Sequence, residues 1–378
     1  MEEILLSLGI MLLVAKVFGN IAERFGVTSL VGETLAGIVL GPLLGWVFLG
    51  SFMNGLLAFG IIFLLFRAGL EVKFDEIKNH AYKASFLAIA GGLVSFFLSF
   101  LVGMFFFHDF LISMAIGTVM ISTNNAALFL LLVKTGEFDS KVGRLIIAIT
   151  IADDVVGILA LSFFNMYVSQ KIAFSSLFFI FLVSIGFYMF ILTTGSKAIS
   201  RVLRRISTFT DEHILFTIPI AIAFGLSYIT NQIGLSVATG AFLTGMAIAN
   251  SQFAEPVIEP KVNTMLKGFI LPVFYASIGT LVVFSGLNIY LIIAIIVAAL
   301  LGKFIGCGVI SRLFGAGWNE IKLIGIAMMP RADDNIIVLQ IILLLGVITH
   351  EIYTSIVFAV ISTAIITPII MRFAYKKR

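Results

Sequence analysis

The chain has 378 residues, of which 60% are hydrophobic and only 12% charged, whereas an average soluble domain carries about 25% charged residues. With a mean hydropathy of +1.15, this composition excludes an ordinary soluble enzyme and predicts an all-α integral membrane protein. The net charge of +4 does not indicate a nucleic-acid partner, because the basic residues lie in short loops between apolar segments, as membrane topology requires.

Thirteen apolar segments are candidates to cross a bilayer, which takes about 20 mostly apolar residues each. In chain order they cover about 3–22, 29–49, 52–71, 84–107, 110–133, 142–168, 173–197, 212–230, 234–250, 263–284, 288–311, 320–346 and 351–372. An odd number puts the termini on opposite sides of the membrane. With the C-terminus in the cytoplasm, 19 of the 24 Lys and Arg residues are cytoplasmic and only Lys171 lies outside. The positive-inside rule therefore predicts a multi-pass protein of the inner or plasma membrane, with its N-terminus outside.

Two adjacent aspartates, Asp153 and Asp154, lie within the apolar segment 142–168. A carboxylate at mid-membrane costs at least ~2.5–3.5 kcal/mol, and such residues usually face a bundle interior or a wet cavity on an ion or proton path. Lys303 is the only charge deep within the segment 288–311, and a buried ammonium group needs a partner. We expect one of the aspartates to be that partner. The alternative is a pair of protonated or hydrogen-bonded aspartates that only connect helices.

A weak internal repeat relates the two halves of the chain. LAGIVLGP (35–42) resembles LTGMAIAN (243–250), and GIIFLLFRAGLEV (60–72) resembles GFILPVFYASIGTLV (268–282). The spacings agree, since Gly37 and Gly69 are 32 residues apart and Gly245 and Gly279 are 34 apart. Spans 1–6 thus match spans 8–13 with span 7 as a linker, so the second copy runs through the membrane inverted. Inverted six-helix repeats with interrupted helices are typical of secondary transporters.

Each half also has a polar break inside a span: STNNAA (122–127), with Thr123 and Asn124, and PRADDN (330–335), with Arg331, Asp333 and Asp334. Such breaks are tolerated at membrane depth only where they line a cavity or are buried in protein. We expect two crossing discontinuous helices, whose ends bring partial charges of both signs to one site. The alternative is that Pro330 and the asparagines merely kink their helices.

The charges near these breaks favour a cation. Asp153, Asp154, Asp333 and Asp334 oppose only Lys303 and Arg331. Two negative charges therefore remain, which suits a monovalent cation or protons, and Thr123 and Asn124 offer neutral oxygens. We expect Arg331 and the neighbouring aspartates to neutralise one another in part.

Other polar residues carry less information. Glu33, Arg67 and Glu71 lie nearer to span ends, and we expect interfacial ion pairs from them. The four histidines are not grouped, and neither a Walker sequence nor GxSxG is present. We therefore expect no enzymatic activity, no metal centre of the histidine type and no cofactor.

The chain resembles the monovalent cation:proton antiporter-2 family of bacterial and archaeal Na⁺/H⁺ exchangers. The stretches that carry the resemblance are TLAGIVLGP, FLLFRAGLEV, STNNAA, IADDVVGILAL, TGAFLTGMAIANS, LGKFIG and MPRADDN. The aspartate pair together with the lysine resembles the electrogenic type of that family. The resemblance implies that Asp154 carries the cation and the proton, that Asp153 pairs with Lys303, and that Thr123, Asn124 and Asp333 lie in the two crossovers. Two departures bear on ion selectivity: the Asn pair of the first crossover, and Ala332-Asp333 with an extra Asp334 in place of Gly-Glu.

We therefore expect an electrogenic, homodimeric Na⁺/H⁺ antiporter that exchanges cytoplasmic Na⁺ for external H⁺ by an elevator motion. The expected domains are scaffold helices at 1–83 and 211–286, a transport core at 84–168 and 287–378, and a linker helix and cytoplasmic loop at 169–210. One alternative is a K⁺/H⁺ antiporter of the same fold. Another is a sodium-coupled symporter, which this acidic site disfavours. An intramembrane aspartyl protease is the third, but its dyad takes one aspartate from each of two helices.

Overall fold

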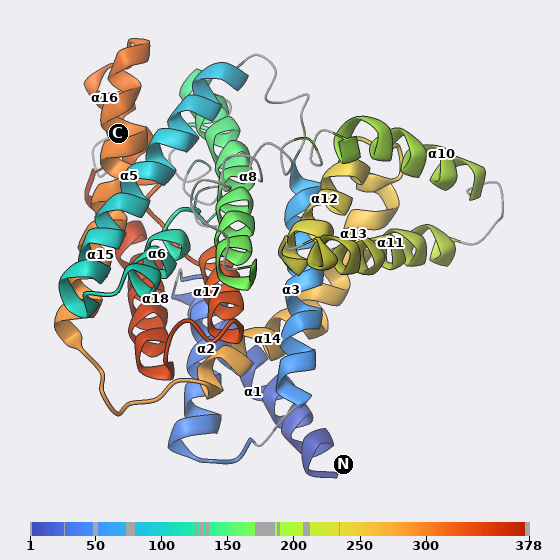
Figure 1. The fold of residues 1–378 in the computed structure, drawn as a ribbon, viewed down its shortest axis with the longest axis horizontal. Helices are drawn as coiled ribbons and strands as arrows, with labels where there is room; N and C mark the ends of the chain where they lie inside the picture. The colour runs from blue at the N-terminus through green and yellow to red at the C-terminus, as the bar shows by residue number, and fades with distance from the viewer. Residues whose placement is uncertain are drawn as a thin grey trace. The chain divides into compact units, whose positions relative to one another are not determined.

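The computed structural model describes residues 2–25, 27–47, 52–72, 80–124, 128, 132, 136–138, 140–170, 186, 190–206, 212–233 and 235–374. Within these ranges every regular element is helical, so the expected all-α membrane class is confirmed. The chain divides into two compact units that alternate along the sequence (Figure 1). The first contains 1–49, 77–157 and 275–378, and the second contains 50–76 and 158–274.

The first unit holds the two interrupted segments. Its helices are α1 (Glu2–Arg24), α2 (Ser29–Ile38), α5 (Ala81–Phe107), α6 (Phe110–Val119), the first part of α8 (Lys141–Gln170), the end of α14 (Leu271–Thr280), α15 (Ile289–Lys303), α16 (Trp318–Ala327), α17 (Asp333–Leu344) and α18 (His350–Ala374). Short π or 3₁₀ turns continue two of these helices: Val39–Leu43 follows α2, and Phe304–Gly308 and then Val309–Phe314 follow α15. Within this unit α2 packs on α1, α5 packs on α6 and α15, and α18 packs on α15 and α17.

Side-chain caps fix where two of these helices begin. Asp109 accepts a hydrogen bond from the Ile112 amide at 2.8 Å and starts α6. Asn288 accepts from the amides of Tyr290 and Leu291 and starts α15. Each cap satisfies amide groups that the first turn of a helix leaves without a partner.

The second unit consists of α3 (Phe52–Glu71), the rest of α8, α10 (Ser196–Ile206), α11 (Glu212–Gln232), α12 (Val237–Ala249), α13 (Glu259–Met265) and the start of α14. Three π turns precede or follow these helices, at Ile191–Gly195, Ala254–Ile258 and Leu266–Ile270. The helix α12 packs on α3 and on α11, and its side chains are buried almost throughout. Most of the predicted span 173–197 and part of the linker at 169–210 lie outside the described residues.

Seven helical runs of the described chain are long and apolar enough to cross a membrane: Glu2–Arg24, Ala81–Phe107, Lys141–Val168, His213–Gln232, Ala254–Thr280, Ile289–Phe314 and His350–Ile370. Each matches one of the thirteen predicted spans. Three further apolar runs are shorter, at Ser29–Leu43, Phe110–Val119 and Val237–Ala249. The predicted spans 110–133 and 320–346 are interrupted, as their polar breaks indicated.

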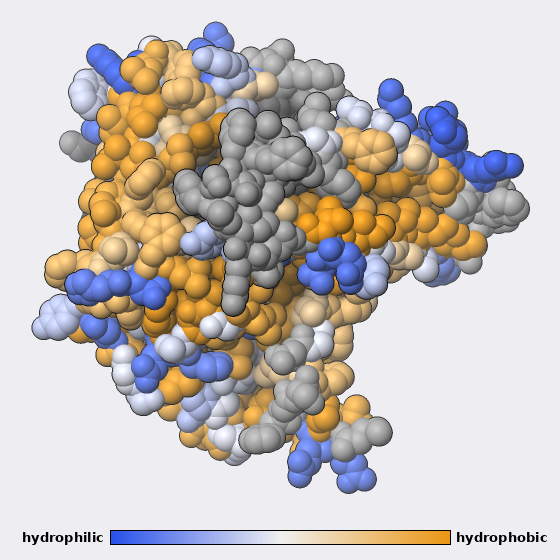
Figure 2. Space-filling view, viewed as in Figure 1, coloured by the Kyte–Doolittle hydropathy of each residue, from blue (hydrophilic) through white to orange (hydrophobic). Residues whose placement is uncertain are grey.

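Large apolar side chains lie exposed along several of these helices, as a membrane protein requires. On α1 and α5, for example, Leu5, Leu13, Phe97 and Phe105 are each more than half exposed. Figure 2 shows apolar side chains over much of the visible face. Lipid rather than water is the favourable neighbour for such surfaces.

Glycines at the repeated positions allow close helix contacts. A Cβ atom built on Gly279 of α14 would lie 2.8 Å from the carbonyl carbon of Gly37 on α2. A Cβ on Gly245 of α12 would lie 2.8 Å from the Cα of Gly69 on α3. Small residues of this kind let helix backbones touch within membranes. The glycines that the sequence repeat aligns therefore form two matching contacts, one in each compact unit.

Candidate functional site

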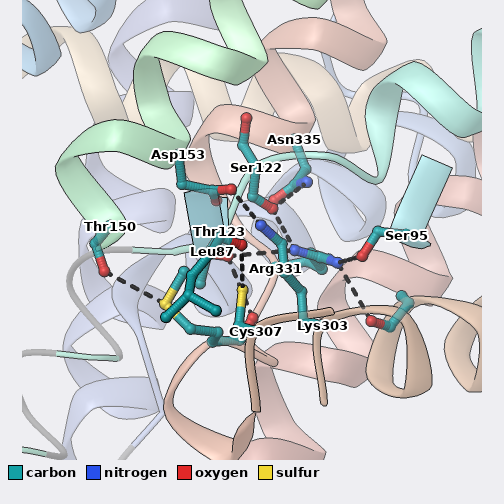
Figure 3. Close-up of polar contacts among 12 residues, drawn as sticks. Leu87, Ser95, Ser122, Thr123, Thr150, Asp153, Lys303, Cys307, Arg331 and Asn335 are labelled. Atoms are coloured by element: carbon teal, nitrogen blue, oxygen red, sulfur yellow. Dashed lines mark hydrogen bonds and ion pairs between the residues drawn. The ribbon is translucent and has the colours of Figure 1, made fainter. Parts of the chain in front are cut away.

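Asp153 and Asp154 lie on α8, which runs without a break from Lys141 to Gln170. Asp153 is fully buried and Asp154 is 5% exposed. The ammonium group of Lys303, at the end of α15, contacts Oδ1 of Asp153 in an ion pair whose side chains are both fully buried (Figure 3). This is the pairing that the resemblance implied. Because burying a lone charge is far more costly than burying a compensated pair, each residue depends on the other.

Close packing of α5 against α15 brings Lys303 into place. A Cβ on Gly302 would lie 2.6 Å from the Cα of Ser95, and one on Gly91 would lie 3.3 Å from the Cδ of Lys303. Gly302 therefore allows α15 to approach Ser95 on α5, and Gly91 leaves room for the lysine side chain. A π turn (Phe304–Gly308) follows Lys303 directly, and such turns occur often at functional sites.

The two polar breaks contact each other, and the place where residues 121–124 meet residues 328–332 is called the crossing below. After α6 ends at Val119, residues 121–124 are not helical, and residues 328–332 separate α16 from α17. The amide of Asn124 donates to the carbonyl of Pro330 at 2.9 Å. The hydroxyl of Thr123 donates to the carbonyl of Met328 at 3.2 Å. Residues 125–127 of the first break lie outside the described chain.

Contacts of α8 bring its aspartates to the level of this crossing. One turn before Asp154, the hydroxyl of Thr150 lies 3.5 Å from the sulfur of Met328 in the second break. Nearly one turn after it, Gly157 packs against the side chain of Ser122 in the first break. Residues three or four apart share a helix face, so Asp154 lies on the face of α8 that contacts both breaks.

Arg331 holds the crossing together. Its guanidinium group, fully buried, donates to the carbonyl of Ser122, to the hydroxyls of Thr123 and Ser95 at 3.4 and 3.0 Å, and to the carbonyl of Ala299 at 3.2 Å (Figure 3). Its own amide donates to the hydroxyl of Thr363 on α18. One side chain thus joins α5, the first break and α15 to the second break. Its positive charge also suits the carbonyl end of α6, which carries partial negative charge.

Asn335 is a second connector that the sequence analysis did not single out. Its amide nitrogen donates to the carbonyls of Val119 and Ser122 at 2.7 and 3.0 Å, and its oxygen accepts from the amide of Ala332 at 3.1 Å. It therefore caps the end of α6 and the start of α17 at the same time. Its position, three residues into a helix that follows a polar break, is the signal that could have identified it.

Asp333 and Asp334 form the first turn of α17 and are half-buried. Carboxylates are favourable there because the helix start carries partial positive charge. The guanidinium of Arg331 hydrogen-bonds the neutral oxygens described above rather than these two aspartates. Among the described residues, no group of three or more His, Cys, Asp or Glu side chains is placed to hold a metal ion.

The three charges expected near span ends differ from one another. Arg67 and Glu71 form an ion pair of 2.7 Å, one turn apart on α3, with both side chains about a quarter exposed. Glu33 does lie in an ion pair, with Lys16 at 3.9 Å, but its own side chain is only 2% exposed. The expected ion pair is therefore present for Glu33, but its carboxylate is buried because α1 covers the face of α2 that carries it.

A family profile described as "Sodium/hydrogen exchanger, transmembrane" matches residues 9–377. The chain belongs to this family. The exchanger is 26% identical over 376 residues to the Na(+)/H(+)-K(+) antiporter GerN of Bacillus cereus, covering 99% of this chain and 96% of that protein. It is 27% identical to a Na(+)/H(+) antiporter of Enterococcus hirae, covering 97% of each chain. These relatives are transporters and not enzymes.

The fold of the exchanger is shared by a solved structure. The sodium proton antiporter MjNhaP1 from Methanocaldococcus jannaschii at pH 8 superposes with a TM-score of 0.72, covering 99% of each chain at 16% sequence identity. The likeness at this identity concerns the fold. Together with the family match, it agrees with the predicted multi-pass membrane protein.

Proposed function

We propose that this chain is a Na⁺/H⁺ antiporter in which Asp154 takes up either a sodium ion or a proton. The observation that carries the proposal is the position of α8, which contacts both helix breaks on the face that holds Asp154. The names of the relatives support the same pair of substrates. A buried carboxylate beside broken helix ends can replace part of the water shell of a small cation.

Competition at one carboxylate is sufficient for exchange. An ionised Asp154 binds Na⁺ and a protonated one does not, so the carrier holds one ion or the other but never both. The coupling holds as long as the empty carrier rarely changes sides. No metal cofactor is needed, because Na⁺ is itself the substrate.

The ion pair of Asp153 and Lys303 makes the exchange electrogenic, so that net charge crosses the membrane in each cycle. When Na⁺ binds, it competes with the ammonium group for the aspartates, and Lys303 can then release its proton. With the proton from Asp154, two protons leave for each Na⁺ that binds, and one net charge moves per cycle. This is the behaviour implied by the resemblance to the aspartate-pair type of the antiporter-2 family.

The matched glycine contacts support the inverted repeat. In the alignment of the two halves, Gly37 corresponds to Gly245 and Gly69 to Gly279. Gly37 lies against Gly279, and Gly245 lies against Gly69, so equivalent positions have equivalent partners. We propose on this basis thirteen spans in two inverted repeats, with the outside N-terminus and cytoplasmic C-terminus given by the positive-inside rule. The division into a fixed scaffold and a moving core, the homodimer and the elevator motion belong to the same proposal.

Purified protein in liposomes tests the function. Adding Na⁺ to wild-type vesicles should release protons, measured with a pH-sensitive dye trapped inside. Asp154→Asn should fold normally and abolish this flux, since the amide has no negative charge and neither takes up nor releases a proton. Asp109→Asn is the matched control, because Asp109 is exposed and asparagine caps a helix equally well. Normal exchange by the Asp154→Asn variant would refute the assignment of the site.

The same vesicles show which cation is exchanged for protons. Because one relative is named a Na(+)/H(+)-K(+) antiporter, K⁺ and Li⁺ are added in turn with Na⁺. We expect the largest proton flux with Na⁺, and a flux driven by K⁺ alone would favour the K⁺/H⁺ alternative.

A further inference from the structure

A second buried carboxylate lies away from the aspartate pair. Glu33 is on α2, and its side chain is 2% exposed. Of its two carboxylate oxygens, Oε2 is buried and has no hydrogen-bond partner in the described part of the chain. Gly19 on α1 leaves room for it, since a Cβ there would lie 2.9 Å from Cγ of Glu33. A glutamate built into a niche between two helices, with an oxygen unused, is an energetically costly arrangement.

Lys16 compensates this carboxylate only loosely. Its ammonium nitrogen is 3.9 Å from Oε1 of Glu33, whereas charge-assisted hydrogen bonds between such groups are about 2.7–2.9 Å long. The lysine side chain is 58% exposed, so it reaches towards the carboxylate from outside the niche. A small cation or a proton can bind the carboxylate of Glu33 instead of the ammonium group of Lys16.

Besides Lys16, the described charged groups that act most strongly on Glu33 are negative. Asp333 at the start of α17 and Glu23 on α1 both interact electrostatically with it. The helix α14, which packs on α2 through Gly37 and Gly279, carries no charged side chain, and Tyr275 is its only titratable group. Acidic neighbours attract a cation to Glu33. Asp333 directly follows the second helix break, so Glu33 lies within electrostatic range of the crossing.

We propose that Glu33 is a second binding site for the transported cation or proton, on the access route between the crossing and the side of the membrane where α1 ends and α2 begins. Lys16 holds the carboxylate when no ion is present. The proposal rests on the exchange function proposed above. In the topology given by the positive-inside rule this side is the cytoplasm, so Glu33 receives Na⁺ before Asp154 does.

Sidedness separates this role from a structural one. Na⁺-dependent proton flux is measured in everted membrane vesicles and in right-side-out vesicles from cells without other antiporters. In the everted vesicles, Glu33→Gln should raise the half-saturating Na⁺ concentration about tenfold, which is ~1.4 kcal/mol of binding free energy. In the right-side-out vesicles it should leave that concentration unchanged, and the rate at saturating Na⁺ should stay similar in both. Lys16→Gln should lower the half-saturating concentration on the same side.

Glu3→Gln is the matched control, because Glu3 is an exposed glutamate at the opposite end of α1. Thermal unfolding in detergent shows whether each variant folds. Two results for Glu33→Gln would overturn the proposal and leave Glu33 a structural partner of Lys16. One is an equal change in the half-saturating Na⁺ concentration from both sides, and the other is a lower melting temperature with an unchanged half-saturating Na⁺ concentration. If wild-type vesicles showed no exchange with any cation, the proposed function itself would fail, which is a distinct result.

Discussion

Replacing Arg331 tests whether one side chain holds the two helix breaks together. The guanidinium group donates four hydrogen bonds, to oxygens of Ser122, Thr123, Ser95 and Ala299. Side-chain hydrogen bonds within membrane proteins contribute about 0.6–1 kcal/mol each, so Arg331→Met should lower the free energy of unfolding by ~2–4 kcal/mol. Arg331→Lys should lose roughly half as much, because one ammonium group cannot reproduce the planar fork of donors.

The assay is unfolding in mixed detergent micelles with increasing SDS, followed by far-ultraviolet circular dichroism. Arg312→Met and Arg312→Lys are the matched controls. Arg312 is exposed, donates to the carbonyl of Ala316 and lies over the ring of Trp318, and exposed contacts of this kind contribute little.

Equal losses for the Arg331 and Arg312 variants would refute the reasoning. The transport assay adds a second criterion, since a crossing that loses its connector should no longer hold the breaks against α8. Arg331→Lys should therefore remain folded but exchange ions more slowly than wild type. A lysine variant with normal stability and normal flux would mean that the guanidinium bonds do not position the crossing.

Three further predictions concern the charges on α8 and α15. Lys303→Ala should destabilise the protein by ~3–5 kcal/mol because it leaves Asp153 buried and uncompensated. The double variant Asp153→Asn with Lys303→Gln should recover part of this loss. Strictly additive losses of stability in a thermal double-mutant cycle would show that the two side chains do not interact. A potential imposed with K⁺ and valinomycin should change the exchange rate in liposomes, and indifference to it, with a clean K⁺ control, would contradict an electrogenic cycle. If H⁺ and Na⁺ compete for Asp154, the half-saturating Na⁺ concentration should rise about tenfold for each unit that pH falls below the range where the carboxyl titrates, and a constant value there would contradict a shared site.

Charges and breaks in the sequence predicted much of the candidate site. The sequence alone identifies Asp153, Asp154 and Lys303, because a charged side chain within an apolar segment has a high free-energy cost in the membrane. The pairing of Asp153 with Lys303 followed from the resemblance and is present in the structure. The interruptions at 121–124 and 328–332 were visible because polar residues and Pro330 replace the apolar pattern there.

The partners of Arg331 and the burial of Glu33 could not be predicted. Two acceptors of the guanidinium are backbone carbonyls, which every residue has, and a third is the hydroxyl of Ser95, far away in the chain. Glu33 lies near the start of its predicted span, so the sequence alone indicated an ion pair there but not the burial of its carboxylate. Only the packing of α1, with Gly19 opposite the carboxylate, removes it from the surface.

The contact of Gly69 with Gly245 also affects the synthesis of the protein. Residues 69 and 245 leave the ribosome far apart in time, because a chain grows by about 5–20 residues per second. At that pace α3 waits roughly 10–35 s in the bilayer before α12 is made. During this interval the glycine face of α3 lacks the helix that it contacts in the folded protein. A ribosome that stalls between the halves therefore leaves an unassembled fragment, which membrane quality-control proteases can recognise by its unpaired glycine face.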